Sequence, residues 1–272
     1  MLFSSMIFLW VFFPVVIVGI AFLTWLPGLT ERRRIWCKNR FLLICSLFFY
    51  AWGGIGYVLI MLGVILVDFF GARLVDAQSG KNRKRILIIT VLANLLVLFF
   101  FKYFNMMVAL AETLVAACSG GLQNGFLADL FSLQGTGAFH LPKIVLPIGI
   151  SFFTFQAISY VIDVYRGQEP QTNILDFALY ISLFPQLIAG PIVQYSDIAR
   201  ELKNRAETRE DFLYGVRRFC QGMGKKVLIA NTLGNAADQI WGLGTDRISG
   251  GLAWLGIISY TLQIYYDFSG YS

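Results

Sequence analysis

The sequence has 272 residues, of which 57% are hydrophobic and only 14% are charged, and its mean hydropathy is +0.66. Soluble domains carry about 25% charged residues, so this composition excludes an ordinary soluble fold and indicates a multi-pass membrane protein. The formal net charge is +6, but the basic residues lie between apolar runs. That placement is typical of cytoplasmic loops under the positive-inside rule, and it argues against nucleic acid as a partner.

The first apolar run, from Met6 to Pro27, contains no charge. It is long enough for one crossing, which takes about 20 residues, and Pro14 is a possible kink within it. The amino terminus has no basic region and no clear cleavage site, so we interpret the run as a retained span. The next segment, Glu31–Arg40, is strongly basic. We expect a cytoplasmic loop here, which places the N-terminus outside.

The second apolar run, Phe41–Val67, is interrupted at Trp52-Gly53-Gly54-Ile55-Gly56 and has basic segments on both sides. We expect the second basic segment, from Arg73 to Arg85, to be another cytoplasmic loop. Two full crossings would need about 40 apolar residues, more than this run offers. We therefore favour a re-entrant pair of short helices hinged at the glycines. The alternative is one long tilted crossing, with one basic loop violating the charge rule.

A third apolar run, Ile86–Phe101, ends at Lys102, which either snorkels to an interface or points into the bundle. The following segment, Ser119–Leu141, has no Lys or Arg, which predicts an external loop. It contains the only histidine, His140. With no carboxylate near it in sequence, we interpret His140 as a surface residue rather than a general base.

Two later stretches are apolar but broken, and we expect both to line a polar cavity. The first, Pro142–Gly167, is interrupted by Pro147 and Gly149, and the second, Asn173–Tyr195, is interrupted by Pro185 and by Gly190–Pro191. Irregular backbone at membrane depth is tolerated only inside protein or along a water-filled cavity. The polar side chains that we expect to line this tunnel, together with two from the last apolar run, are Ser151, Thr154, Gln156, Gln186, Gln263 and Asp267.

Between these stretches and the last apolar run, Leu252–Ser272, lies the mixed-charge segment Ser196–Lys226. We expect a cytoplasmic loop followed by an amphipathic helix on the membrane surface, because Phe212, Val216, Phe219 and Met223 recur at helical spacing.

Three acids lie at the edges of apolar runs. We expect Asp68 and Asp163 at the water interface or in an ion pair, such as Asp163 with Arg166. Asp267 is closely flanked by aromatic residues, which favours a buried role. The cysteines form no CxxC pair, and we expect no metal site.

Several sequence blocks resemble the membrane-bound O-acyltransferase family, most closely its alginate O-acetyltransferase branch. They occur in the family's order along the whole chain. The blocks at 146–167 and 184–195 are the most specific, because long strings that mix polar residues into apolar ones seldom recur by chance. The blocks are MLFSSMIFLW at 1–10, FLLICSLFFYAWGG at 41–54, FKYFN at 101–105, LPIGISFFTFQAISYVIDVYRG at 146–167, FPQLIAGPIVQY at 184–195 and YYDFSGYS at 265–272.

The resemblance implies an all-α, polytopic transmembrane helical bundle with re-entrant and broken helices. It also implies a multi-pass enzyme of the bacterial inner membrane that transfers acyl groups, usually acetyl, to hydroxyls of an exported polysaccharide. The implied partners are membrane lipid and either the polysaccharide or a periplasmic acetyl-transfer protein. We expect no bound cofactor; the acyl donor, acetyl-CoA or an acyl carrier, stays open. We interpret residues 1–272 as a single membrane domain.

The family's catalytic histidine follows the FSGYS block, so we expect it after Ser272, and His140 does not lie in that motif. The chain therefore resembles the amino-terminal part of such an enzyme, incomplete at its C-terminus, and we expect it to be inactive alone. Two alternatives stay open: transfer of D-alanine to teichoic acid by a related enzyme, and a non-catalytic membrane scaffold or transporter if the native chain ends at Ser272.

Overall fold

The computed structural model describes residues 3, 5–28, 30–118, 146–147, 149–187, 193–205, 207–244 and 247–271. Throughout these ranges the regular elements are helices, which confirms the all-α class. The chain divides into two compact units, Met1–Val58 with Asn173–Ser272, and Leu59–Thr172. Within the described ranges, three helices are long and apolar enough to cross a membrane: Phe8–Trp25, Ile55–Ala77 and Gly80–Phe104. The chain is therefore a helical membrane protein.

The first of these helices begins as a π-helix, η1 (Phe8–Phe12), and continues as the α-helix α1 (Phe13–Trp25). Pro14 lies in the first turn of α1, where the helix changes from π to α geometry. Because the helix is continuous from Phe8, Pro14 removes one backbone hydrogen bond to the preceding turn, and irregular turns are common at such sites. The prediction of a first apolar helix long enough to cross is confirmed.

The first basic segment is helical, and the expectation of a loop was wrong. Helix α2 (Glu31–Ala51) begins at Glu31 and includes every basic residue up to Arg40. Arg and Lys are good helix formers, and an acidic residue in the first turn complements the helix dipole. The structure also satisfies two of the charges: Lys38 pairs with Glu207 at 2.7 Å and Arg40 with Asp176 at 3.3 Å.

The glycine break in the second apolar run is confirmed. Helix α2 ends at Ala51, and helix α3 (Ile55–Ala77) begins after a turn in which Gly54 has a φ of +145°, a region that favours glycine. The two helices are not short, however: α2 has 21 residues and α3 has 23. Each extends into the adjoining basic segment, because charged residues at a helix end do not stop the helix.

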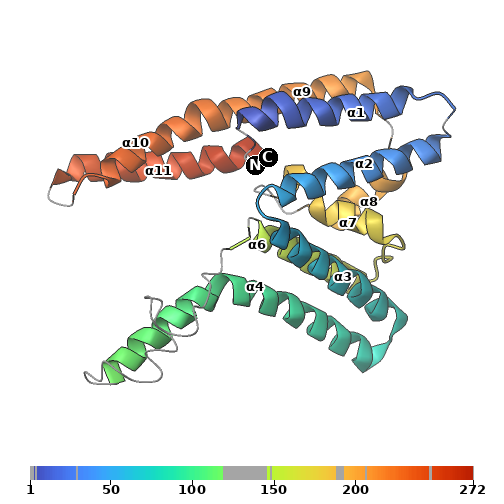
Figure 1. Ribbon diagram of the computed structural model, residues 1–272, viewed down its shortest axis with the longest axis horizontal. Coiled ribbons are helices and arrows are strands. Elements are labelled where there is room, and N and C mark those ends of the chain that lie inside the picture. The colour runs from blue at the N-terminus through green and yellow to red at the C-terminus, as the bar shows by residue number, and fades with distance from the viewer. Residues whose placement is uncertain are drawn as a thin grey trace. The chain divides into compact units, whose positions relative to one another are not determined.

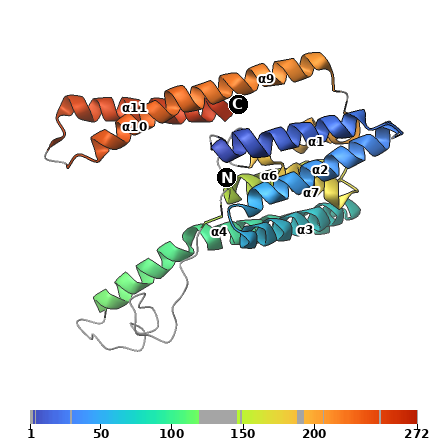
Figure 2. The same cartoon turned by 45° about the horizontal axis from the view of Figure 1, so that its top comes forward.

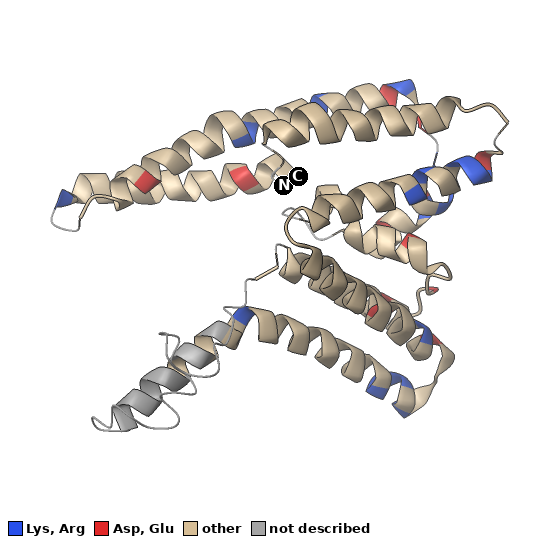
Figure 3. Cartoon of the chain, in the orientation of Figure 1, with Lys and Arg blue, Asp and Glu red and all other residues tan. Residues whose placement is uncertain are grey.

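The second unit consists of α3, α4 (Gly80–Cys118) and α6 (Ile150–Tyr165). The second basic loop was also wrongly predicted, because Arg73 lies in α3 and Lys81 to Arg85 lie in the first turns of α4 (Figure 3). Helix α6 packs against α4 and starts after Gly149, whose φ of 75° suits a glycine. Lys102 is exposed on α4, and its Nζ lies 5.5 Å from the centre of the Tyr103 ring. His140 and the predicted external loop lie outside the described residues.

In the first unit, α7 (Ile174–Ser182) packs against α2 and is followed by the short 3-10 helix η2 (Phe184–Gln186). The predicted break at Pro185 is therefore confirmed, while Gly190–Pro191 lies outside the described residues. Helix α8 (Tyr195–Lys203) follows, so the start of the mixed-charge segment is helical and the loop expected there was wrong. Five aromatic rings, with neighbouring centroids 4.8–6.4 Å apart, form the core at this end: Phe3, Phe8, Phe12, Phe49 and Phe184.

A helix is present where the amphipathic helix was predicted, α9 (Arg209–Gly224), with Thr208 and Asp211 forming a capping box at its start. Its place on the membrane surface stays a prediction. It continues without a break through the π-helix η3 (Lys225–Ala230) into α10 (Asn231–Trp241). Helix α11 (Gly250–Tyr271) runs back along this long helix (Figures 1 and 2). The result is a helical hairpin, and its helix α11 contains the predicted tunnel residues Gln263 and Asp267.

Candidate functional site

The hairpin of α9–η3–α10 with α11 is held together by a close backbone approach. A Cβ atom built on Gly270 would lie 3.0 Å from the carbonyl oxygen of Gly222, and one built on Gly222 would overlap the carbonyl oxygen of Gly270. Small residues allow two helix backbones to approach in this way. The contact fixes the register of α11 against η3, and so it fixes which side chains meet across the hairpin.

Two consecutive lysines of η3 reach across to the end of α11. Lys226 forms an ion pair with Asp267, and its Nζ lies 5.0 Å from the centre of the Tyr271 ring. Lys225 donates a hydrogen bond from Nζ to Oγ of Ser269 at 2.9 Å. π-helical turns are rare and frequently occur at functional sites. We call these five side chains, Lys225, Lys226, Asp267, Ser269 and Tyr271, the hairpin cluster.

The hairpin cluster is only partly buried. The side chain of Lys226 is 15% exposed and that of Asp267 is 43% exposed. The expectation that Asp267 would be buried was therefore wrong. The aromatic residues beside Asp267 do not bury it, because Tyr265 and Phe268 are themselves 64% and 49% exposed.

The other two tunnel candidates of this unit are Gln263 on α11 and Gln186 in η2. Gln263 is one turn before Asp267 on α11, and its amide packs against Gly234 of α10, where a Cβ would lie 2.9 Å from Nε2. Gln186 donates from Nε2 to the carbonyl oxygen of Tyr180 at 2.6 Å. Gln263 and Asp267 thus share one face of α11, as residues four apart do. Sequence inspection missed their lysine and glycine partners, because these lie in η3 and α10.

The remaining candidates, Ser151, Thr154 and Gln156, lie on α6 in the second unit. Thr154 is fully buried and its Oγ1 has no hydrogen-bond partner within the described part of the chain. Gln156 is 4% exposed, whereas Ser151 is half-buried. The role of all six residues as tunnel lining stays a prediction.

Asp68 lies in the same unit, and here the expectation of an interfacial or ion-paired carboxylate was wrong. It is fully buried in α3 and accepts a hydrogen bond from Nδ2 of Asn94 on α4 at 2.7 Å. For Asp163, none of the ion pairs within the described ranges joins it to Arg166. The neighbouring basic residue that is engaged is Arg83, which donates to the carbonyl oxygen of Val164 at 3.0 Å.

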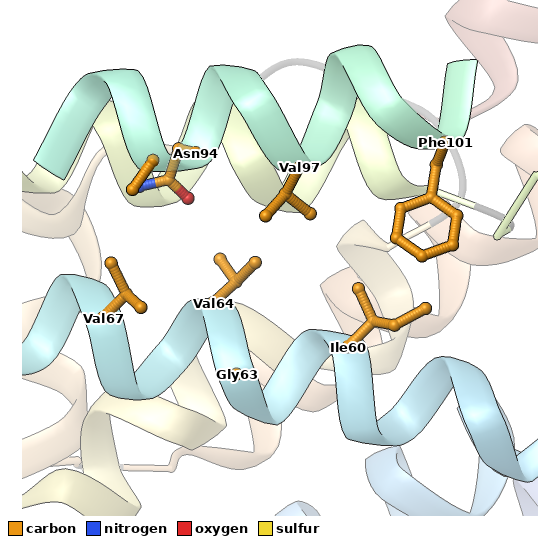
Figure 4. Close-up of a pocket in the computed structure, with 8 residues that line it drawn as sticks. Ile60, Gly63, Val64, Val67, Asn94, Val97 and Phe101 are labelled. Atoms are coloured by element: carbon orange, nitrogen blue, oxygen red, sulfur yellow. The ribbon is translucent and has the colours of Figure 1, made fainter. Parts of the chain in front are cut away.

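A pocket of about 320 Å³ lies between α3 and α4 beside the Asp68–Asn94 pair (Figure 4). Asn94 contributes the polar end of the wall. The other lining residues are apolar or glycine, and none of them is a predicted tunnel residue: Ile60, Gly63, Val64, Val67, Ala93, Val97 and Phe101. Apart from Asn94 its walls carry no polar side chain, so it is a separate feature from the charged hairpin cluster.

Comparison with known proteins agrees with the family resemblance that the sequence blocks indicate. It is 40% identical over 275 residues to a probable alginate O-acetylase of Pseudomonas aeruginosa, and the match covers 100% of this chain and 48% of that protein. It is 30% identical over 300 residues to a peptidoglycan O-acetyltransferase of Helicobacter pylori, covering 100% of this chain and 52% of the relative. A teichoic acid D-alanyltransferase of Lacticaseibacillus rhamnosus is 24% identical over 72% of this chain and 51% of that protein.

The chain thus spans about half the length of the curated relatives that it matches. No family model matches it, and no solved structure does.

Proposed function

Because this chain belongs to the membrane-bound O-acyltransferase family, we propose that it takes part in the O-acetylation of an exported polysaccharide such as alginate. The observation that carries this proposal is the 40% identity to a probable alginate O-acetylase over the full length of the chain. The peptidoglycan O-acetyltransferase among the relatives supports the same reaction on a different glycan. In this role the helices form the membrane scaffold along which an acyl group reaches a sugar hydroxyl.

The alternative, transfer of D-alanine to teichoic acid, has weaker support. The relative that carries that name is 24% identical over 209 residues, against 40% over 275 residues for the alginate O-acetylase. Both reactions form an ester on an extracytoplasmic polymer, so the shared architecture fits either one. The difference in identity favours acetyl transfer.

The experiment that separates these functions is deletion of the chromosomal segment that encodes the chain. We expect the O-acetyl content of the exported polysaccharide, measured by proton NMR, to fall to background, with D-alanine esters of the cell wall unchanged. Loss of the D-alanine esters with acetyl groups retained would establish the alternative. If neither ester changes, the chain has no part in either transfer.

We also propose that residues 1–272 alone do not transfer acyl groups, because the motif that carries the catalytic histidine in the resembling family is matched by no residue of this sequence. The test is to incubate the purified chain with acetyl-CoA and oligosaccharide acceptors. Acetylated product above that of a heat-denatured control would disprove this statement and leave the pathway assignment intact.

The proposed location is the bacterial inner membrane, with the N-terminus outside. The charge distribution supports this orientation, because Arg32, Arg33 and Arg34 stand at the start of α2. We expect a cysteine introduced at Ser5 to react with a membrane-impermeant thiol reagent in intact cells, and one at Glu31 to react only after lysis. The reverse pattern would invert the topology.

A further inference from the structure

The hairpin cluster contains two ammonium groups and one carboxylate. Lys226 is paired with Asp267, whereas Lys225 donates to the neutral hydroxyl of Ser269. None of the ion pairs in the described ranges includes Lys225. The cluster therefore carries one positive charge that none of its carboxylates balances. The second helix of the hairpin, α11, is mostly apolar.

Donors are available to hold an anion at this point. The ammonium group of Lys225 has three N–H bonds and uses one for Ser269, while the Ser269 hydroxyl accepts that bond and keeps its own proton to donate. Lys226 lies beside them with its side chain only 15% exposed. A partly desolvated ammonium pair with an excess charge is stabilised by an anion, because charges removed from water are costly unless paired.

The geometry is fixed before any ligand arrives. The Gly222–Gly270 contact sets the register of α11 against η3, and the ring of Tyr271 lies against Lys226 on the other side. The π-turn places consecutive lysines so that both reach α11. Binding at such a preorganised site needs little further ordering of side chains.

We propose that Lys225 and Ser269 bind a phosphate group of the acyl donor, a phosphopantetheine thioester. This inference rests on the proposed function, which requires an activated acetyl group carried on such a thioester. Lysine binds phosphate as a point charge. Phosphate is favoured over a uronate carboxylate of the polysaccharide, because Lys225 lies in the mixed-charge segment Ser196–Lys226. We propose that this segment faces the cytoplasm, where the donor is made.

The site can be tested without any acyl transfer, by measuring how fast each lysine of the purified chain reacts with a water-soluble amine-acylating reagent. Peptide mass spectrometry then gives the extent of modification at every lysine. With coenzyme A at ten times its Kd, we expect the reaction of Lys225 to slow about tenfold, the factor set by site occupancy. Lys203 is exposed on α8 and serves as the internal reference. Equal slowing at both lysines would overturn the proposal.

Three probes identify the recognised group. We expect coenzyme A to protect Lys225, and pantetheine without phosphate not to do so. A phosphopantetheine-bearing carrier peptide distinguishes the two sources of the group: stronger protection by the peptide than by coenzyme A identifies a carrier as the donor. Protection by pantetheine, or by oligouronate in place of coenzyme A, would disprove phosphate recognition.

Variants complete the test, with Lys226 as the reporter. In the parent chain we expect coenzyme A to protect Lys226 as well, and we expect Lys225→Gln to abolish this protection and Lys225→Arg to retain it. The matched control Lys84→Gln, at an exposed position of α4, keeps Lys203 as the reference and should behave as the parent chain. The helix content of each variant, measured by circular dichroism, shows that the hairpin is folded. Protection that survives in Lys225→Gln would overturn the site. That failure would leave the acetyltransferase proposal standing, since the deletion experiment measures esters and not binding.

Discussion

Asp68 and Asp267 have similar local sequences, each followed by phenylalanine within an apolar helix. They differ in burial and in the group that each contacts. Asp68 is fully buried and faces a neutral amide, Asn94, which lies 26 residues away in the chain. Asp267 is 43% exposed and faces a cation, Lys226, at a distance of 41 residues. The comparison teaches that a hydrogen bond to a neutral group can hold an acid in the interior, while the ion pair is formed where water still reaches.

The first prediction tests the buried member of this pair and carries the largest effect. Asn94→Leu removes the partner of a fully buried carboxyl, and we expect it to lower the free energy of unfolding by about 3 kcal/mol. The measurement is a titration of the detergent-solubilised chain with sodium dodecyl sulfate. The double variant Asp68→Leu with Asn94→Leu removes both polar groups, so it should recover most of the loss. A double variant as unstable as the single one would show that the hydrogen bond is not the cause.

The second prediction concerns the contact that positions the exposed pair. In Gly222→Ala the added methyl group overlaps the carbonyl oxygen of Gly270, and we expect a loss of about 2 kcal/mol, as for other overpacked contacts. Gly215→Ala is the matched control, since it lies on the same helix α9 and a Cβ there meets nothing within 4 Å. We expect this control to be slightly stabilising, because alanine is the better helix former. Equal stability of the two variants would contradict the close approach.

The third prediction has the smallest effect. Lys226→Gln breaks the ion pair with Asp267, but that carboxylate is 43% exposed and keeps contact with water. We therefore expect a loss below about 1 kcal/mol, as for other exposed ion pairs. The same detergent titration measures it. A loss as large as that of Asn94→Leu would erase the distinction between the buried and the exposed acid.

Local backbone features could be predicted from the sequence. Gly54 and Pro185 both lie at breaks between helices, as expected, because glycine at positive φ and proline without an N–H impose their effects within one turn. Helix ends are harder to predict from the sequence. The positive-inside pattern indicates loops at the basic segments, but arginine and lysine are good helix formers and both segments are helical. The change from α9 to the π-turn η3 leaves no signal in the pattern of apolar residues.

Long-range partners could not be predicted. Nothing near Asp68 points to Asn94, and nothing near Asp267 points to Lys226, because each pair is created by the packing of two helices. The spacing of polar residues indicated which helix faces matter, as for Gln263 and Asp267 on α11. It gave no information on whether each side chain meets an amide, a lysine or a glycine.

The ion pair of Lys38 with Glu207 links charge to the order of synthesis. The two residues are 169 positions apart, so at roughly 5–20 residues per second about 8–34 s separate their appearance from the ribosome. In the proposed orientation, with the start of α2 on the cytoplasmic side, Lys38 would add during that interval to the cations that orient the first helices. Once Glu207 arrives, the same charge is neutralised and becomes a link between α2 and the segment before α9. In that orientation one lysine would first help to orient the chain and would afterwards link two segments of the folded protein.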